Sequence, residues 1–280
     1  MGERNGFRKL ARAASAAFPE NYFLQTAHYC IASEKIPAGF DGLRIVHLSD
    51  LHGCSFGRGN SRLLRRIRLS EPDLVVMTGD MADGLTRDFG PVFRFSESLC
   101  RDRPVYFVSG NHEEQLRAAR RNEFLEGLRS AGAHILDNAS APLARGGAVI
   151  RLCGLRLPTR YYRADHSALT VEGVRRRIGR KEEGEYTILL THNPFFFPVY
   201  AAWGADLTLC GHVHGGMVRL PWIGGLLSPE RSFFPKYSAG DYRIGSRDMI
   251  VSRGLAAGPR IGNIPEVVEV TLRSRSGMEK

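Results

Sequence analysis

The sequence is poor in cysteine and in long apolar runs. Its five cysteines are an odd number with no Cys-x-x-Cys pair, which argues against a disulfide framework and against a thiolate zinc site. The longest stretch without a charged residue, 186–205, contains two prolines, a glycine and a histidine, so we expect no membrane-spanning helix there. These features predict a globular protein of a reducing compartment, the cytoplasm.

Acidic residues are scarce relative to basic ones. The chain has 29 Asp and Glu against 39 Lys and Arg, a net charge of +10. Such a charge favours polyanionic or membrane-surface partners without choosing between them. With 280 residues, of which 43% are hydrophobic, the chain is long enough for a large buried core. No low-complexity segment follows Leu43, so we expect one large domain.

The first residues form a basic segment with apolar residues at helical spacing. Those residues are Phe7, Leu10, Ala11, Ala14 and Phe18, with Arg8, Lys9 and Arg12 on the other faces. The pattern is typical of a short amphipathic helix, which either lies on an anionic bilayer or packs on its own domain. Its apolar run is too short for a signal-peptide core. We therefore divide the chain into this segment at 1–35, a domain at 36–275 and a tail at 276–280.

Several apolar segments of strand length end in polar loops. Segments 43–48, 73–78 and 105–109 are each followed by a loop that contains glycine, and 186–190 and 206–210 run into histidines. The loops that follow the first three segments recur at intervals of about 30 residues, which is typical of βαβ crossovers in a parallel sheet. After Gly215, short segments broken by Gly and Pro predict hairpins and a second sheet. The simplest fold is a single α/β domain with two sheets.

The loop-end residues share one property: each carries a hard oxygen donor or an imidazole. They are Asp50, His52, Asp80, Asn111, His112, His192, His212 and His214. Any one of them alone could be a turn residue or a helix cap. Together they suit two divalent ions, Mn, Zn or Fe, which at a separation of about 3.5–4 Å clamp a phosphate. Asp80, central in the order, is the candidate bridging ligand.

The same residues form a five-part pattern that resembles the calcineurin-like metallophosphoesterases. The pattern comprises DLH at 50–52, GDMAD at 79–83, GNHE at 110–113, His192 and GHVH at 211–214. Over roughly residues 36–273 the chain is also similar to a bacterial membrane-associated branch of that family. The resemblance implies a two-sheet β-sandwich flanked by helices. It also implies hydrolysis of a phosphoester or diphosphate bond, with cleavage of UDP-2,3-diacylglucosamine as one example within the branch.

The resemblance further implies a role for each loop-end residue. One ion would be held by Asp50, His52, Asp80 and His214, and the other by Asp80, Asn111, His192 and His212. His112 would stand beside the ions and stabilise or protonate the departing oxygen. A hydroxide between the ions would attack the phosphorus in line. Asp83, the second Asp of GDMAD, is expected to brace its loop by accepting hydrogen bonds from backbone N–H groups.

A basic stretch and several aromatic residues bear on the substrate. Arg58, Arg62, Arg65 and Arg66 follow the first metal loop without an intervening acid. They form either a solvated face or a binding site for an anionic lipid or a diphosphate. Aromatic residues near His192 and after position 214 belong to the core or line a groove for acyl chains. An anion-binding role for the arginines and a groove lined by the aromatic residues would both favour a lipid-type substrate.

Three functional classes follow from these features. The leading one is a metal-dependent phosphodiesterase or pyrophosphatase that acts on a lipid-linked or sugar-nucleotide substrate, peripheral on the inner face of the cell membrane. The second is a nucleotide or nucleic-acid phosphodiesterase, which the net charge favours, although no nucleic-acid-binding module accompanies the charge. The third is a non-catalytic metal-binding scaffold, which the complete set of donors disfavours.

Overall fold

The computed structural model describes residues 23–163, 168–216, 218–220, 224–227, 235–255 and 262–275. The amphipathic helix expected within residues 1–18 and the tail at 276–280 lie outside these ranges. Within them, no helix combines the length and the apolar character that crossing a bilayer requires. All five cysteines fall in the described part of the chain, and all are free thiols.

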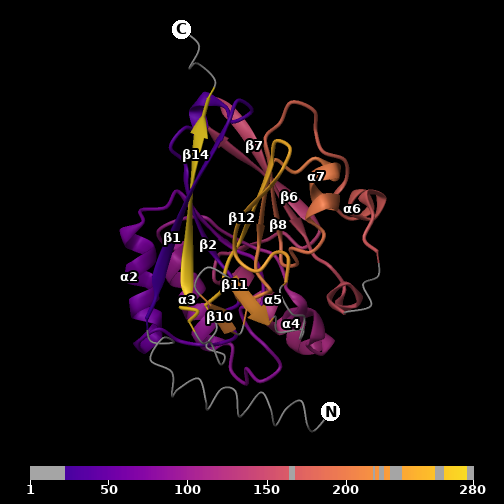
Figure 1. The fold of residues 1–280 in the computed structure, drawn as a ribbon. Helices are drawn as coiled ribbons and strands as arrows, with labels where there is room; N and C mark the ends of the chain where they lie inside the picture. The colour runs from indigo at the N-terminus through magenta and orange to yellow at the C-terminus, as the bar shows by residue number, and fades with distance from the viewer. Residues whose placement is uncertain are drawn as a thin grey trace.

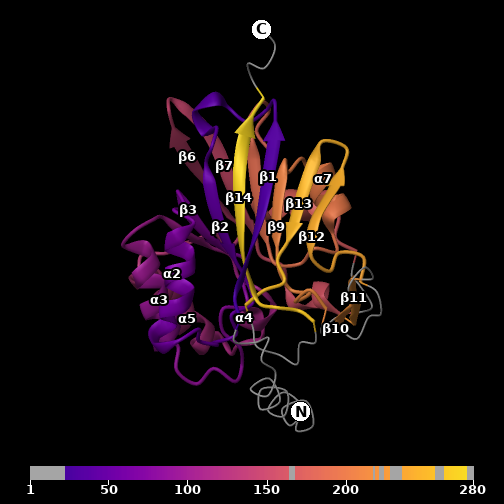
Figure 2. The same cartoon turned by 60° about the vertical axis from the view of Figure 1, so that its left-hand side comes forward.

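Two six-stranded sheets form the centre of the molecule (Figures 1 and 2). The first has the order β1 (Gln25–Ser33), β14 (Glu266–Ser274), β2 (Arg44–Leu48), β3 (Leu74–Met77), β4 (Val105–Phe107) and β5 (His134–Ile135). The second has the order β12 (Gly240–Ile244), β13 (Arg247–Val251), β9 (Leu207–Cys210), β8 (Thr187–Thr191), β7 (Ala148–Leu155) and β6 (Ala139–Arg145). A separate hairpin pairs β10 (Val218–Leu220) with β11 (Gly224–Leu227).

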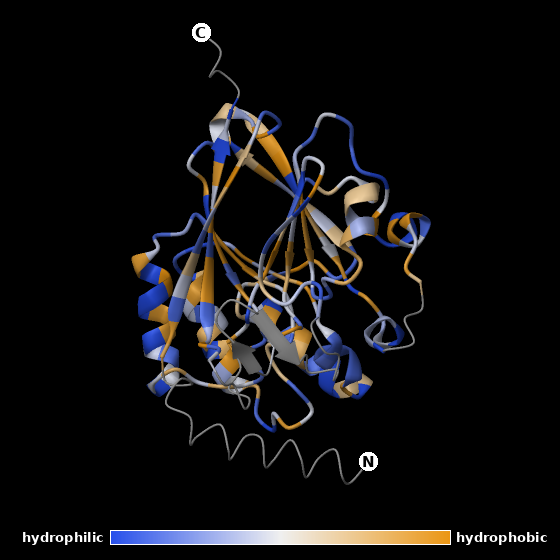
Figure 3. Cartoon of the chain, in the orientation of Figure 1, coloured by the Kyte–Doolittle hydropathy of each residue, from blue (hydrophilic) through white to orange (hydrophobic). Residues whose placement is uncertain are grey.

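The strands are buried on both faces because each sheet packs between the other sheet and a layer of helices. One apolar cluster lies between the sheets and includes Ile45 and Val76 of the first and Leu152 and Ile188 of the second. Helices α2 (Ser61–Leu69), α3 (Gly90–Cys100) and α5 (Ala118–Ser130) cover the outer face of the first sheet. Helices α6 (Val171–Ile178) and α7 (Phe197–Trp203) cover the second sheet. Hydrophobic residues accordingly run along the central strands in Figure 3, as expected of doubly covered sheets.

Short helical turns complete the chain at its loops. They are η2 (Ala38–Phe40), η3 (Arg58–Asn60), α4 (Asn111–Gln115) and η4 (Thr159–Tyr162). The turn α4 begins at Asn111, directly after the loop that follows β4. Two of these turns, α4 and η4, pack against each other although they are far apart in the sequence.

The two-sheet sandwich flanked by helices confirms the fold class expected from the sequence, but the sheets are composed differently. The first three predicted strands are parallel neighbours β2, β3 and β4, whereas β8 and β9 belong to the second sheet. Segments after Gly215 form the expected hairpins, β10 with β11 and β12 with β13, but β13 also pairs with β9, and β14 lies between β1 and β2 in the first sheet. Local patterns identify strands, but long-range burial selects their partners.

The predicted start of the domain at residue 36 also needs correction. Strand β1, at residues 25–33, pairs with β14 along its whole length and is an edge strand of the first sheet. Most of its side chains are partly or fully exposed, because an edge strand that carries no helix layer on one side buries little. The sequence signal was therefore weak, and the sheet begins before residue 36.

Candidate metal centre

The eight predicted donors all lie just beyond strand ends. Asp50 and His52 follow β2, and Asp80 follows β3. Asn111 and His112 open α4 after β4. The remaining three donors come from the second sheet: His192 follows β8, and His212 and His214 follow β9. Because the five strands run in the same direction within their sheets, these loops gather at one end of the sandwich.

The backbone of these loops is unusual. Positive φ angles occur at Asp50 (56°), His52 (48°), Asp80 (54°), His212 (76°) and His214 (53°). Residues other than glycine seldom adopt this left-handed region, and each such residue stores strain that the surrounding structure must hold. Five strained donors in one cluster indicate that the loops are shaped for a function rather than for stability.

Two glycines allow the loops to approach closely. A Cβ atom at Gly110 would overlap the Asp80 Oδ1 atom, and one at Gly211 would overlap Ser49 Oγ and lie 2.5 Å from Asp50 Oδ2. The backbone N–H of His112 donates to Asp80 Oδ1 at 2.8 Å. Hence the loop after β3 packs directly against the loop after β4, and the loop after β9 against the loop after β2.

The side chains converge on the two carboxylates. His192 Nε2 lies 3.1 Å from Asp80 Oδ2 and 3.7 Å from Asp50 Oδ1. His214 Nε2 lies 3.2 Å from Asp50 Oδ1, and His52 Nε2 lies 3.8 Å from Asp80 Oδ2. Three overlapping groups could each hold an ion: Asp50, His52 and His214; His52, Asp80 and His112; and Asp80, His192 and His212. Asp80 is common to two of them.

The electrostatics of the cluster favour a positive charge between the carboxylates. Burial opposes ionisation of Asp50, but His214 and His192 outweigh it and hold the pKa of Asp50 well below its usual range. Burial likewise disfavours a charged His192, yet Asp80 and Asp50 prevail and raise the pKa of His192 to about 9. The burial of His52, partly offset by Asp80, lowers its pKa to about 4, so this ring stays neutral.

The donor set fits divalent metal ions. Asn111 Oδ1 is buried without a hydrogen-bond partner among the residues that the structure describes. The Nε2 atoms of His52 and His214 face each other at 3.3 Å, so a cation between the loops could take a ligand from each ring. Buried acceptors left unsatisfied are costly. Imidazole, carboxylate and amide donors together suit Mn, Fe or Zn.

Second-layer contacts orient the imidazoles. His192 Nδ1 bonds the Thr78 carbonyl oxygen at 2.7 Å, which directs Nε2 toward Asp80. The Thr78 hydroxyl in turn bonds His47 Nε2 at 2.7 Å. Burial lowers the pKa of His47 to about 3, so this ring is neutral. His47 is not one of the donors expected from the sequence, and its contact reaches the site only through Thr78.

Asp83 braces its loop as expected from the sequence. Its Oδ1 atom accepts from the Leu85 backbone N–H at 3.0 Å and from the Thr86 hydroxyl at 2.9 Å. Its Oδ2 atom lies 3.8 Å from His52 Nδ1. The carboxylate thus stands behind the His52 ring, on the side opposite the Nε2 atom that faces the cluster.

Glu113 ties two of the loops together and was missed as a functional residue. Its carboxylate accepts hydrogen bonds from the backbone N–H groups of Asp80 (2.8 Å), Met81 (2.8 Å), Ala82 (3.2 Å) and Gly110 (2.9 Å). Burial and the neighbouring Asp80 carboxylate raise the pKa of Glu113 to about 8, although the hydrogen bonds from the backbone N–H groups act to lower it. The residue closes the GNHE motif, which was the one signal that could have identified it.

The structure brings His112 into the cluster and leaves the four arginines on the outside of the first sheet. His112 Nε2 lies 3.8 Å from Asp80 Oδ2, and its ring meets the His52 ring edge-on at 4.6 Å. Arg58 in η3 and Arg62, Arg65 and Arg66 in α2 are exposed, and Arg66 donates to the Leu24 carbonyl at 2.9 Å. Helix α2 covers the outer face of the first sheet (Figure 2).

An aromatic wall borders the cluster on the side of the second sheet. The ring of Tyr162 meets that of His212 edge-on at 5.0 Å, and the ring of Phe195 does so at 6.2 Å. Tyr161 and Phe196 also meet edge-on, with centroids 5.7 Å apart. Tyr162 lies in η4. Trp222, Phe233 and Phe234, which the sequence offered for the same wall, lie outside the described residues.

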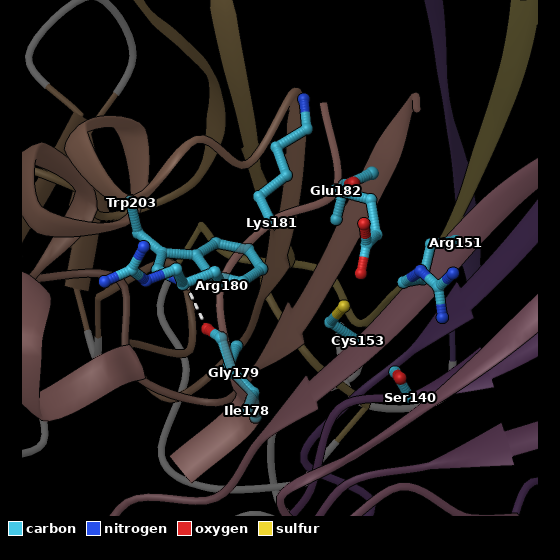
Figure 4. A pocket seen from close by; sticks show the side chains of 10 residues that line it. Ser140, Arg151, Cys153, Ile178, Gly179, Arg180, Lys181, Glu182 and Trp203 are labelled. Atoms are coloured by element: carbon cyan, nitrogen blue, oxygen red, sulfur yellow. Dashed lines mark hydrogen bonds between the residues drawn. The ribbon is translucent and has the colours of Figure 1, made fainter. Parts of the chain in front are cut away.

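A pocket of about 270 Å³ lies elsewhere, on the outer face of the second sheet (Figure 4). Two of its charged side chains already have partners: Arg151 pairs with Glu185, and Lys181 pairs with Asp206. Trp203 Nε1 donates to the Gly179 carbonyl at 2.9 Å and closes one side. As the described residues define it, this lining shares no member with the donor cluster.

A two-sheet sandwich that gathers carboxylates and imidazoles at its strand ends defines a metal-dependent hydrolase of phosphoester bonds. The chain belongs to the calcineurin-like phosphoesterase family, whose model matches residues 43–216. It is similar to the uncharacterized metallophosphoesterase YkuE of Bacillus subtilis (strain 168), with 27% identity over 268 residues, 92% of this chain and 89% of that one. It is also similar to phosphodiesterase YaeI of Escherichia coli (strain K12), with 27% identity over 235 residues, 82% of each chain.

Among solved structures, the NAD nucleotidase NadN of Haemophilus influenzae has a TM-score of 0.51 at 16% identity. The likeness covers 77% of this chain and 51% of that one. It therefore shows a shared fold and nothing about a shared substrate.

Proposed function

We propose that this chain hydrolyses a phosphodiester or diphosphate bond with two divalent ions held by the donor cluster. Asp50, His52, Asp80 and His214 would hold one ion, and Asp80, Asn111, His192 and His212 the other. The observation that carries the proposal is the position of Asp80, whose Oδ2 atom lies 3.8 Å from His52 Nε2 and 3.1 Å from His192 Nε2, two donors assigned to different ions. Bridging by a carboxylate screens the repulsion between two cations.

Bound there, the ions would supply positive charge to the phosphoryl oxygens and lower the pKa of a water molecule. The residues of the chain position the reaction. Asn111 and the two carboxylates fix where a phosphate lies, and the aromatic wall excludes water from one side. His112, at the rim of the cluster and only partly buried, is placed to donate a proton to the departing oxygen.

The proposed substrate is lipid-linked or a sugar nucleotide, such as UDP-2,3-diacylglucosamine. The aromatic wall of Tyr162, Phe195 and Phe196 supports it, because such rings can pack against acyl chains or a base. The basic N-terminal segment supports a location at the inner face of the cell membrane, where anionic lipids attract such segments. Hydrolysis of a nucleic acid is the alternative, supported by the net charge of +10 alone.

Hydrolysis of two aryl phosphates tests the proposal. Manganese-loaded wild type should cleave bis(p-nitrophenyl) phosphate faster than p-nitrophenyl phosphate, and Asn111→Ala should lose at least about a hundredfold in rate, because it removes a ligand of one ion. Asn122→Ala, a change at an exposed position of α5, is the matched control and should keep wild-type activity. Equal activity in the wild type and Asn111→Ala would contradict the proposed site.

A further inference from the structure

A cluster of two arginines and one glutamate lies beside the donor cluster and has no role in the proposed reaction so far. Glu114 Oε1 accepts from Arg121 Nη1 at 3.0 Å and lies 3.2 Å from Arg156 Nη1. Arg121 comes from α5, and Arg156 follows β7. Two guanidinium groups on one carboxylate leave an excess of one positive charge.

This cluster borders the candidate metal centre. Glu114 lies three residues after Asn111 in α4, and residues three apart on a helix have Cβ atoms about 5–6 Å from each other. Helix α4 packs against η4, whose Tyr162 meets His212 at 5.0 Å. The arginines therefore lie near Asn111, which would hold one of the two ions.

The cluster has more donors than its carboxylate can use. Arg121 Nε, Arg156 Nε and the hydroxyl of Tyr162 are buried without a hydrogen-bond partner among the described residues, and Tyr162 is only 9% exposed. The two arginine side chains are still 29% and 26% exposed. A guanidinium carries five N–H donors in a planar fork that matches phosphate oxygens. If Arg121 and Arg156 served only to pair with Glu114, they would need fewer hydrogen-bond donors and no exposure to solvent.

We propose that Arg121 and Arg156, oriented by Glu114, form a second anion subsite that binds the phosphate next to the one being cleaved. The inference rests on the proposed function and narrows it: the preferred substrate is a diphosphate diester rather than a simple phosphodiester. The excess positive charge offsets the second phosphate, while the metal centre takes the first.

Calorimetric binding to the manganese-loaded protein tests this subsite without any need for turnover. The probes are UDP-glucose, which has two adjacent phosphates, and the methyl ester of uridine 5′-monophosphate, which has one. Wild type should bind UDP-glucose at least about tenfold more tightly. Arg121→Met and Arg156→Met should each lower the affinity for UDP-glucose about 10- to 100-fold, the range for a charged hydrogen bond. Each should change the affinity for the methyl ester less than about twofold.

Each variant keeps one arginine on Glu114, so neither leaves that carboxylate without a partner. Arg129→Met, on the exposed side of the same helix α5, is the matched control and should bind both probes as the wild type does. Equal affinity of the wild type for the two probes would overturn the subsite. An equal loss of affinity for both probes in the arginine variants would also overturn it.

The result of this binding experiment can be distinguished from the result of the hydrolysis experiment that tests the proposed function. If the wild type fails to cleave any aryl ester but still prefers UDP-glucose through Arg121 and Arg156, the subsite stands and the hydrolase proposal fails. If it cleaves the aryl diester and shows no preference, the hydrolase proposal stands and the subsite fails.

Discussion

Single atoms mark the site at the residue scale. The amide oxygen of Asn111 is buried without a hydrogen-bond partner in the part of the chain that the structure describes. An unsatisfied buried polar group costs about 1–3 kcal/mol, so a fold keeps such a group where a ligand can satisfy it. A cation held by the donor cluster would satisfy this oxygen.

His47 gives the first prediction, on pH. Burial holds its pKa at about 3, against 6.5 for an ordinary histidine. Between these values the unfolded chain binds a proton that the folded chain does not, so folding stability falls as the pH drops below about 6.5. The slope from this one group approaches about 1.4 kcal/mol per pH unit. In His47→Gln, urea unfolding of the metal-free protein at pH 7, 6 and 5 should show a correspondingly shallower decline.

His134→Gln is the matched control for this measurement, because His134 is exposed. It should retain the wild-type pH dependence. A His47→Gln protein whose stability declines as steeply as that of the wild type would show that His47 is not held neutral by the fold.

At the scale of elements, the site depends on loops that touch across strand ends. The loop after β9 approaches the loop after β2 so closely that only glycine fits at position 211. The loop after β3 is joined to α4 through three hydrogen bonds from its backbone N–H groups to Glu113. These contacts set the strained backbone of Asp50 and Asp80 more directly than the strands do.

Gly211→Ala should damage the site by displacing Asp50. Its Cβ atom would overlap Ser49 Oγ and crowd Asp50 Oδ2, so the loop must shift. We expect a loss of about 1–3 kcal/mol in the free energy of unfolding together with weaker manganese binding, measured by urea unfolding and calorimetry. Gly84→Ala is the control, since a Cβ there meets nothing within 4 Å. Unchanged manganese affinity in Gly211→Ala would refute the role of this contact.

Glu113→Gln tests the link between α4 and the loop after β3. The amide keeps the shape of the side chain but replaces one acceptor oxygen by a donor group, so N–H groups that now bond Glu113 lose their partner. We expect manganese affinity to fall about 10- to 100-fold, as for other residues that orient metal ligands, while the circular dichroism spectrum stays unchanged. Glu97→Gln, at an exposed position of α3, should bind manganese normally. The same normal binding by Glu113→Gln would exclude a positioning role.

At the scale of the whole molecule, the candidate centre exists only when the two sheets are packed. The first sheet supplies Asp50, Asp80 and Asn111, and the second supplies His192 and His214. The apolar cluster between the sheets holds these two sets in register. Ion binding should therefore be coupled to folding of the entire sandwich rather than to one motif.

Removal of metal should lower the melting temperature as a consequence. A ligand that binds only the folded state at a hundredfold excess over its Kd adds about 2.7 kcal/mol, which for a domain of this size raises the melting temperature by roughly 5–10 °C. Differential scanning fluorimetry with manganese, and then with a chelator, measures the shift. Asn111→Ala should show a smaller shift than Asn122→Ala, and no shift in the wild type would argue against a metal centre that spans both sheets.

The sequence by itself was sufficient to place the donors at strand ends, because a strand and its end are local properties, while the two-sheet sandwich was expected from the family resemblance. An apolar run followed by a polar loop with glycine specifies a strand and its end wherever the strand later pairs. The same patterns placed Asp83 as a brace of its own loop, and its bond to the Leu85 N–H lies within two residues.

The tertiary structure alone decided which strands pair and which side chains meet. β14 returns from the end of the chain to lie between β1 and β2, and β1 escaped notice because an exposed edge strand lacks a clear pattern. The contacts of Glu113, the aromatic wall at Tyr162 and the pairing of Arg121 and Arg156 on Glu114 join segments remote in sequence. Such contacts depend on long-range burial and packing, which no window of local sequence encodes.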